Sequence, residues 1–295
     1  MSVVEELEQL GGVARRRALL RRVDRAALDR ALEVGDIERI GHGRFALPGA
    51  DRAVRAAVAC GGTVGLLDAA LHHGWAVKTR PRTPHVVVSR GRRVPAARAR
   101  EVTLHRAELA PHEIDDRWTA EETTLDHCLR RLPFDEALCV ADSALREGVG
   151  RDVLRRLAAG AKGPGSAQLR RVVAEASPEA DNPFESTARS IALDVPGLVV
   201  RPQVELEGLG FRVDLADVRL RIVIECDSFE WHGKRSALER DARRYNAMVV
   251  NGWIVLRLCY DDVMHHPDEV RRTLVAAVAL AQLLNKALLS TRPAA

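Results

Sequence analysis

The chain has 295 residues and a formal net charge of +4; 46% of its residues are hydrophobic and 29% are charged. This composition is ordinary for a soluble globular protein, and the length allows two or three domains. No signal peptide is expected at residues 1–6, and the apolar tract at 274–284 is too short to cross a bilayer. Five cysteines without a Cys-x-x-Cys pair argue against a zinc site. We therefore expect a cytoplasmic protein with no membrane partner.

The first fifty residues predict a winged helix-turn-helix. Three helical patterns come first, at residues 3–10, 14–22 and 24–34. Asp24 is the expected N-cap of the third helix, and Gly35 is its stop signal. Short apolar segments at residues 37–40 and 44–47 flank Gly41-His42-Gly43, which predicts a hairpin of the wing type.

Two roles stay open for this region. Three arginines near its second helix, Arg15, Arg16 and Arg17, are placed to contact DNA phosphates. The third helix would enter the DNA groove, yet it carries Asp29 and Glu33, and acids repel the DNA backbone. The alternative role is therefore dimerisation, as a homodimer, or contact with another protein.

Residues 51–160 form a mixed α+β region in which we find no catalytic set. Helical patterns cover residues 64–73, 121–126 and 135–146, and a strand covers 85–89. Residues 78–106 hold nine Lys or Arg against one acid, as a polyanion-binding surface requires. The candidates to bind DNA there are Arg90, Arg92 and Arg93. Only four of the 45 basic residues are Lys, so genome base composition is an alternative cause of the arginine runs.

The glycine-rich segment 160–166 is the clearest flexible joint, and residues 167–290 after it follow a coherent order. The expected elements are a helix at 183–192, strands at 199–205, 211–217 and 222–227, a helix at 234–250, a strand at 253–258 and a helix at 268–289. This order predicts an α/β layer in which helices cover a small mixed sheet.

The strands at 211–217 and 222–227 carry alternating acids. Because side chains alternate between the two faces of a strand, a two-residue turn at Val218-Arg219 would pair Asp214 with Val223. Asp214, Glu225 and Asp227 would then share one face, away from the apolar side. Three carboxylates on a rigid sheet suit a hard divalent cation. The alternative is a solvent-facing sheet whose acids have no function.

Two segments of the first fifty residues, Gly11-Gly-Val-Ala-Arg15 and Arg39-Ile-Gly-His-Gly-Arg-Phe-Ala-Leu-Pro48, resemble the N-terminal domain of AbiEi-family antitoxins. These antitoxins belong to type IV toxin–antitoxin systems. The resemblance implies a winged helix-turn-helix, and it adds a toxin to the candidate partners. The plan of the middle region is also similar to the second region of AbiEi-like proteins.

The C-terminal order, with an acid in the first helix and further acids on adjacent strands, resembles the PD-(D/E)XK nuclease superfamily. The motifs that carry this resemblance are Gln203-Val-Glu205, Gly210-Phe-Arg-Val-Asp-Leu-Ala-Asp217, Ile224-Glu-Cys-Asp227, Trp231-His232, Asp241-x-x-Arg244 and Gly252-Trp-Ile-Val-Leu-Arg257. Together they resemble domain of unknown function 559, a family similar to very-short-patch-repair (Vsr-like) endonucleases. The resemblance covers about 110 residues and implies a restriction-endonuclease-like domain that acts on DNA.

By this resemblance, Asp214 and Glu225 would bind Mg²⁺ or Mn²⁺, and Glu185 would hold a metal-bound water. Asp227 stands where the superfamily usually has Lys, so it would join the metal cage or act as a base. His232 would shuttle a proton; the alternative is a surface histidine beside a packed Trp231. Three basic side chains are placed near DNA: Lys234, Arg235 and Arg244. Arg244 has a pairing with Asp241 as its alternative.

Two functions follow from these observations. The first is a Mg²⁺-dependent DNA endonuclease in defence or repair. The second is a non-enzymatic, DNA-binding regulator of antitoxin type, whose nuclease fold has decayed. The four acids favour the first function, and the missing Lys favours the second.

Overall fold

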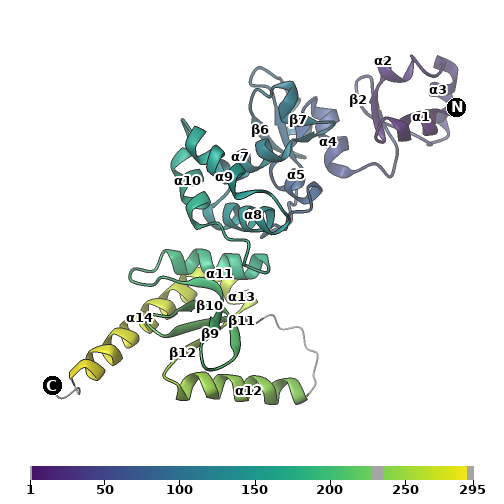
Figure 1. The fold of residues 1–295 in the computed structure, drawn as a ribbon. Helices are drawn as coiled ribbons and strands as arrows, with labels where there is room; N and C mark the ends of the chain where they lie inside the picture. The colour runs from purple at the N-terminus through teal and green to yellow at the C-terminus, as the bar shows by residue number, and fades with distance from the viewer. Residues whose placement is uncertain (1, 228–234, 291–295) are drawn as a thin grey trace. The chain divides into compact units, whose positions relative to one another are not determined.

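The structure is a computed structural model that describes residues 2–227 and 235–290. The chain divides into two compact units, whose elements are labelled in Figure 1. The first unit comprises Met1–Trp75 and Thr79–Cys128, and the second comprises Ala76–Lys78 and Leu129–Ala295. Within the described ranges, every helix is too short or too polar to serve as a membrane span. All five cysteines are free thiols.

The first unit begins with three helices and a small antiparallel sheet. The helices are α1 (Val3–Gln9), α2 (Arg16–Leu19) and α3 (Arg25–Glu33), and the strands are β1 (Val13–Arg15), β2 (Glu38–Gly41) and β3 (Arg44–Ala46) in the order β1-β3-β2. Asp24 caps α3 as predicted, because its carboxylate accepts the N–H of Ala27 at 2.7 Å. Leu7, Leu28 and Phe45 are buried at the centre of this region.

One part of the expected pattern is wrong. Residues 13–15 form a strand that pairs with β3, and only residues 16–19 are helical, where a helix over 14–22 was predicted. The N–H of Arg16 donates to the carbonyl of Gly43, which ties the start of α2 to the hairpin. Leu19 is buried, whereas Leu20 is exposed. The element order agrees with a winged helix-turn-helix, and that designation stays a prediction.

The rest of the first unit is a five-stranded sheet with helices against it. Its helices are α4 (Arg52–Cys60), α5 (Leu66–His72), the short α6 (Ala96–Ala99) and α7 (Glu121–Arg131), whose last turn belongs to the second unit. The strands are β4 (Thr63–Val64), β5 (His85–Val88), β6 (Thr103–Arg106), β7 (Ile114–Asp115) and β8 (Trp118–Thr119), in the order β6-β5-β4-β8-β7. The single-turn 3-10 helix Pro111–Glu113 precedes β7.

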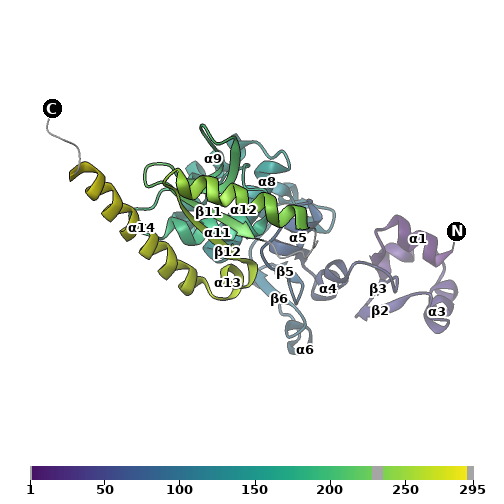
Figure 2. The same ribbon diagram turned by 90° about the horizontal axis from the view of Figure 1, so that it is seen from below.

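The second unit contains a four-stranded mixed sheet between two layers of helix. Its strands are β9 (Arg201–Leu206), β10 (Phe211–Asp217), β11 (Ile222–Asp227) and β12 (Ile254–Cys259), in the order β12-β11-β10-β9. Only the β11–β12 pair is parallel. Figures 1 and 2 show α11 (Pro183–Leu193), α13 (Tyr260–His265) and α14 (Pro267–Ser290) on one face and α12 (Arg235–Val250) on the other.

Both faces of this sheet are apolar, which fixes which side of each strand is buried. Leu215 and Ile224 pack with α11 and α14 in one cluster, while Val213 and Val223 pack with Met248 of α12 in the other. The expectation that the acids lie on a face away from the apolar side is therefore wrong. A buried carboxylate at the centre of this sheet, such as that of Glu225, has to be accommodated beside apolar side chains.

Three further helices join this sheet in the second unit: α8 (Phe134–Arg146), α9 (Arg151–Gly160) and α10 (Ser166–Glu175). The expected boundary at 160–166 falls inside the unit. Gln168 donates to the carbonyls of Leu129 and Leu132, and Arg130 donates to those of Lys162 and Pro164. This segment is therefore a packed connection and does not separate two domains.

A buried ion pair connects α8 to α11. Asp142 is fully buried and Arg189 is 3% exposed, and two hydrogen bonds of 2.8 Å join their side chains. Asp142 also accepts from the Ser186 hydroxyl at 2.7 Å and from the Ser177 N–H at 2.8 Å. Buried charges persist when their hydrogen-bonding capacity is met in this way. The pair therefore holds α11 against α8.

We predict that Asp142→Ala destabilises the protein by about 3–5 kcal/mol, because it leaves the Arg189 guanidinium buried without its partner. Urea unfolding followed by circular dichroism measures this loss. Asp152→Ala removes the acid of the exposed Asp152–Arg156 pair and is the matched control, with an expected cost below about 1 kcal/mol. Equal losses in the two variants would contradict the assignment.

Candidate active site

The hairpin between β10 and β11 sets the geometry of the site. Its ladder pairs Asp217 with Ile222 and Leu215 with Ile224, so residues 218–221 form a four-residue loop. Asp217 is 1% exposed and organises this loop by accepting the N–H groups of Arg219 at 3.0 Å and Leu220 at 3.2 Å. Arg221 completes the turn in the left-handed region, with a φ of 51°.

The predicted two-residue turn at Val218-Arg219 is therefore wrong. Val223 pairs with Ala216, whereas Asp214 was expected there. The register differs from the predicted one by two residues, and an even shift does not exchange the faces of the paired residues 215–217 and 222–224. It brings Asp214 next to Glu225, which the predicted pairing placed two residues further along.

Asp214 lies where β10 and β11 part. The ladder between them ends at the Leu215–Ile224 pair, and the Asp214 carboxylate then accepts the N–H of Cys226 at 2.8 Å. On the other side of β10, Val213 pairs with Val204 and Leu215 pairs with Pro202 of β9. Gln203 lies between these two pairs, and its φ is 52°. The Asp214 carboxylate thus accepts a backbone N–H of β11 that a longer β10–β11 ladder would pair with a backbone carbonyl.

Glu225 is 5% exposed and hydrogen-bonds to the Asp214 side chain. Burial, and next the negative charge of Asp214, raise the pKa of Glu225 to about 7, and the Arg244 guanidinium opposes this shift. Near neutral pH, Glu225 therefore exchanges its proton while it lies beside the Asp214 carboxylate. Such a pair is characteristic of sites that do chemistry or bind cations.

Arg244 connects α12 to this pair. One Nη atom donates to Glu225 at 2.6 Å and to the carbonyl of Arg212 at 2.5 Å, while its Nε is buried without a hydrogen-bond partner. The guanidinium also lies 5.9 Å from the centre of the Phe211 ring. The sequence suggested a phosphate or Asp241 as the partner of Arg244, and the structure shows Glu225.

Asp227 has a different partner. Arg257 on the parallel strand β12 donates to it at 2.5 Å and stacks over Tyr245 at 4.5 Å. Burial, and next the charge of Asp227, raise the pKa of Tyr245 to about 12. No group of three or more His, Cys, Asp or Glu in the described part of the chain is arranged to hold a metal. The side chains of Asp214, Glu225 and Asp227 are thus not positioned to bind one cation together.

Glu185 approaches from α11. It is 5% exposed and accepts hydrogen bonds from the Asp181 N–H at 3.0 Å, the Asn182 amide at 2.7 Å and the Gln203 amide at 2.9 Å. Burial raises the pKa of Glu185, and among the smaller causes is the charge of Asp214. Asn182 also caps α11 by accepting the Glu185 N–H, so the helix start and the carboxylate are fixed together.

Cys226 lies among the four acids. Burial raises the pKa of its thiol well above the usual value, and the acids add to this in the order Asp214, Glu185, Glu225 and Asp227. The four predicted acids therefore share one electrostatic neighbourhood. Sequence reasoning did not assign roles to Gln203 and Arg257, although both lie in the quoted motifs and their polar positions on neighbouring strands were the available signal.

The other predicted residues belong to the first unit, begin α12 or fall outside the described residues. His232 and Lys234 fall outside the described ranges, and Arg235 is the first residue of α12. In the first unit, Arg15, Arg17, Arg90 and Arg93 are exposed, while Arg16 and Arg92 are half-buried. Arg92 donates to the carbonyl of Cys60 at 3.1 Å, so part of its role is structural.

Comparisons with known proteins agree with this geometry at a coarse level. The family model REase_MTES_1575 matches residues 185–278, a stretch that contains all four acids. It supports a restriction-endonuclease-like domain at the C-terminus. The more detailed assignments to domain of unknown function 559, to Vsr-like enzymes and to AbiEi-like antitoxins stay predictions.

Two curated relatives come from strains of Mycobacterium tuberculosis. They are the uncharacterized protein MT2308 of strain CDC 1551 / Oshkosh and the uncharacterized protein Rv2248 of strain ATCC 25618 / H37Rv. Each is 29% identical over 158 residues, which are 52% of this chain and 56% of the relative. The chain thus spans about half the length of the curated relatives it matches.

A solved structure is also similar, the crystal structure of RV2827C protein from Mycobacterium tuberculosis. It has 17% sequence identity and a TM-score of 0.38, and the match covers 63% of this chain and 78% of that chain.

We predict a pH signature of the Glu225 pair in metal-free protein. The pKa of Glu225 is near 7 in the folded state and about 4.5 when unfolded, so the folded state binds the proton more tightly. This contribution to stability is complete below pH 4.5 and is lost as the pH rises through 7. Glu225→Gln removes it, so the unfolding free energy of the variant relative to wild type should rise by roughly 1–3 kcal/mol between pH 4.5 and 8.

Urea unfolding in EDTA at several pH values measures this difference. Glu205→Gln is the control, because Glu205 is an exposed acid on β9 of the same sheet. Its difference from wild type should stay flat with pH. The same flat profile for Glu225→Gln would contradict a raised pKa at Glu225.

Proposed function

We propose that the C-terminal domain is a metal-dependent DNA endonuclease of Vsr-like type that hydrolyses phosphodiester bonds, with a role in defence or repair. The observation that carries this proposal is the buried Asp214–Glu225 pair in a restriction-endonuclease-like domain. A pair of hydrogen-bonded acids at the point where two strands part is costly for folding alone. Its retention is explained by a ligand that the two carboxylates bind together.

The donor set fits a hard divalent cation. Mg²⁺ is commonly bound through one or two carboxylates, with waters and substrate phosphates completing its shell, so Asp214 and Glu225 suffice as protein ligands. Mn²⁺ takes the same oxygen donors. When bound, the ion would polarise the scissile phosphate and offset the charge that develops during hydrolysis.

The chain's own residues prepare the site for that chemistry. Asp214 is oriented by the Cys226 N–H, and Glu225 by Arg244, so both carboxylates are fixed before DNA arrives. Glu225 releases its proton near neutral pH, so its carboxylate becomes available there to bind the ion. The expected role of Glu185, holding a water, fits its rigid position, since three donors orient its oxygens.

Arg257 is the side chain that supplies positive charge at the position of the missing Lys. It contacts Asp227 directly and comes from the neighbouring strand, so the charge is present although the motif residue is an acid. This contact leaves Asp227 committed to Arg257 and favours a role in positioning over a role as a metal ligand. His232 remains the proposed proton shuttle, and it lies outside the described residues.

A second function has one observation in its favour. Glu225 and Asp227 are each ion-paired with an arginine, as expected for a site that has lost its metal and its activity. In that case the protein is a non-enzymatic, DNA-binding regulator of antitoxin type. Its toxin partner follows from the AbiEi resemblance and its homodimer from the acids Asp29 and Glu33 of the third helix, and both stay predictions.

We predict that Asp214→Asn and Glu225→Gln each reduce DNA cleavage by at least roughly 100-fold, because a metal at this site is worth several kcal/mol to the transition state. Plasmid and single-stranded DNA are incubated with wild type and with each variant, in Mg²⁺ and in EDTA. The control Glu205→Gln should cleave as wild type, since Glu205 lies at the exposed surface of β9.

Two results would contradict the endonuclease proposal. One is cleavage by wild type that persists undiminished in EDTA, because the activity would then not depend on a metal. The other is full activity in Asp214→Asn, which would place the chemistry elsewhere. If wild type cleaves neither DNA under any metal, while binding it, the antitoxin-type regulator is the better description.

A further inference from the structure

Four arginines of the first unit lie close together beside the end of α4, and we call them the arginine cluster: Arg15, Arg44, Arg92 and Arg98. They come from separate parts of the sequence, namely β1, β3, the segment after β5 and the short α6. Arg44 interacts electrostatically with each of the other three. This set differs from the one expected from sequence, because it includes Arg44 and Arg98 and omits Arg16, Arg17, Arg90 and Arg93.

Two glycines make room for the cluster. Gly61 follows α4 with a φ of 72°, and a Cβ there would overlap the Arg92 guanidinium and lie 2.9 Å from an Nη of Arg44. At Gly41 in the hairpin, a Cβ would lie 3.7 Å from an Nη of Arg98 and 3.8 Å from an Nη of Arg44. The guanidinium of Arg44 therefore lies between those of Arg92 and Arg98.

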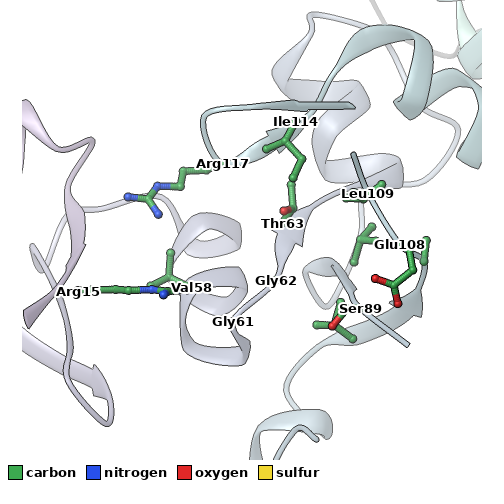
Figure 3. Close-up of a pocket in the computed structure, with 13 residues that line it drawn as sticks. Arg15, Val58, Gly61, Gly62, Thr63, Ser89, Glu108, Leu109, Ile114 and Arg117 are labelled. Atoms are coloured by element: carbon green, nitrogen blue, oxygen red, sulfur yellow. The ribbon is translucent and has the colours of Figure 1, made fainter. Parts of the chain in front are cut away.

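Arg15 extends the cluster to the edge of a pocket of about 280 Å³. Figure 3 shows Arg15 and Arg117 on one side of this pocket and Ser89 and Glu108 on the other. The positive charge thus gathers at the Arg15 side. The Glu108 carboxylate is engaged by the Arg90 N–H at 2.8 Å.

Two acids near the cluster, Glu101 and Glu108, form no ion pair with its arginines in the described residues. Within the part of the chain that the structure describes, none of its four arginines forms an ion pair, and Arg15 and Arg98 form no side-chain hydrogen bond either. Glu101 is the acid that affects the neighbouring Cys60. Burial, and then the charges of Arg92, Arg15 and Arg98, lower the pKa of Arg44. In the second unit, by contrast, Arg189, Arg244 and Arg257 each contact a carboxylate.

Part of the cluster has a structural role. Arg44 donates to the carbonyl of Ala59 at 2.7 Å and Arg92 to that of Cys60 at 3.1 Å, so both satisfy carbonyls at the end of α4. A guanidinium has five N–H donors, and capping uses only one of them on each side chain. Capping therefore accounts for the positions of Arg44 and Arg92, and it leaves Arg15 and Arg98 without an explanation.

We propose that the arginine cluster binds the phosphate backbone of duplex DNA. Guanidinium groups held near one another without acids match phosphate oxygens in charge and in geometry. Four positive charges, from β1, β3, the segment after β5 and α6, suit successive phosphates of a strand better than one small anion. This site lies in the first unit and is independent of the proposed nuclease function, because it needs neither metal nor cleavage.

Fluorescence anisotropy with a labelled 20-base-pair duplex, in EDTA, tests the proposal on the full chain. The test variant is Arg15→Ala/Arg98→Ala, since these two side chains form no hydrogen bond within the described residues. The matched control, Arg156→Ala/Arg272→Ala, removes two exposed helical arginines from the second unit. Thermal unfolding of both variants verifies that the fold is kept.

We expect the test variant to bind at least roughly tenfold more weakly, equally for unrelated sequences, and to lower the slope of log affinity against log salt by about 2. The control should bind as wild type. Arg15→Lys/Arg98→Lys keeps the charge and should retain most of the affinity. Unlabelled duplex should displace the probe, whereas inorganic phosphate at millimolar concentration should not.

Three outcomes would overturn the proposal. Equal affinity and equal salt slope in the test and control variants would show that the cluster does not touch DNA. Equal losses in both would show that only net charge matters. If inorganic phosphate displaces the duplex, or binds wild type when the duplex does not, the cluster is a small-anion site.

Discussion

The candidate site depends on one side chain in a turn, Asp217. Its buried carboxylate accepts N–H groups of the four-residue loop and that of Val199, and it pairs with Arg219. These bonds fix the register of β10 against β11, and the register places Asp214 beside Glu225. A slip of one residue would turn one carboxylate to the other face of the sheet and separate the pair. The chemistry therefore depends on a residue that does not take part in it.

Arginine has opposite roles in the two units. In the second unit, Arg189, Arg244 and Arg257 neutralise buried or half-buried acids and so stabilise the fold around the site. In the first unit, the arginine cluster has no such acids within the described residues. Composition alone does not distinguish these two roles, because an arginine-rich chain contains arginines of both kinds. The difference appears only when the partners of each guanidinium are known.

The sequence predicted local structure well where the apolar residues followed a single helical or strand periodicity. The four strands and the main helices of the second unit lie close to the expected ranges, and Asp24 caps α3. The hairpin register and the limits of the units were not predictable, because they depend on contacts between distant residues. The loop needs Asp217 to be buried, and residues 160–166 are held by Arg130, about thirty positions earlier, which donates to the carbonyls of Lys162 and Pro164. The pairing of Arg257 with Asp227 was likewise not predictable from the sequence.

Asp227, at the position of the usual Lys, changes the charge of the site but leaves the site able to attract a metal ion. Glu185, Asp214, Glu225 and Asp227 face two guanidiniums, those of Arg244 and Arg257. With all of them ionised, the group carries two uncompensated negative charges, which is the deficit that one divalent cation fills. Without a cation, a proton relieves part of the same deficit, because burial, and next the charge of Asp214, raise the pKa of Glu225 to about 7. A Lys in place of Asp227 would have removed the deficit and with it part of the attraction for a metal.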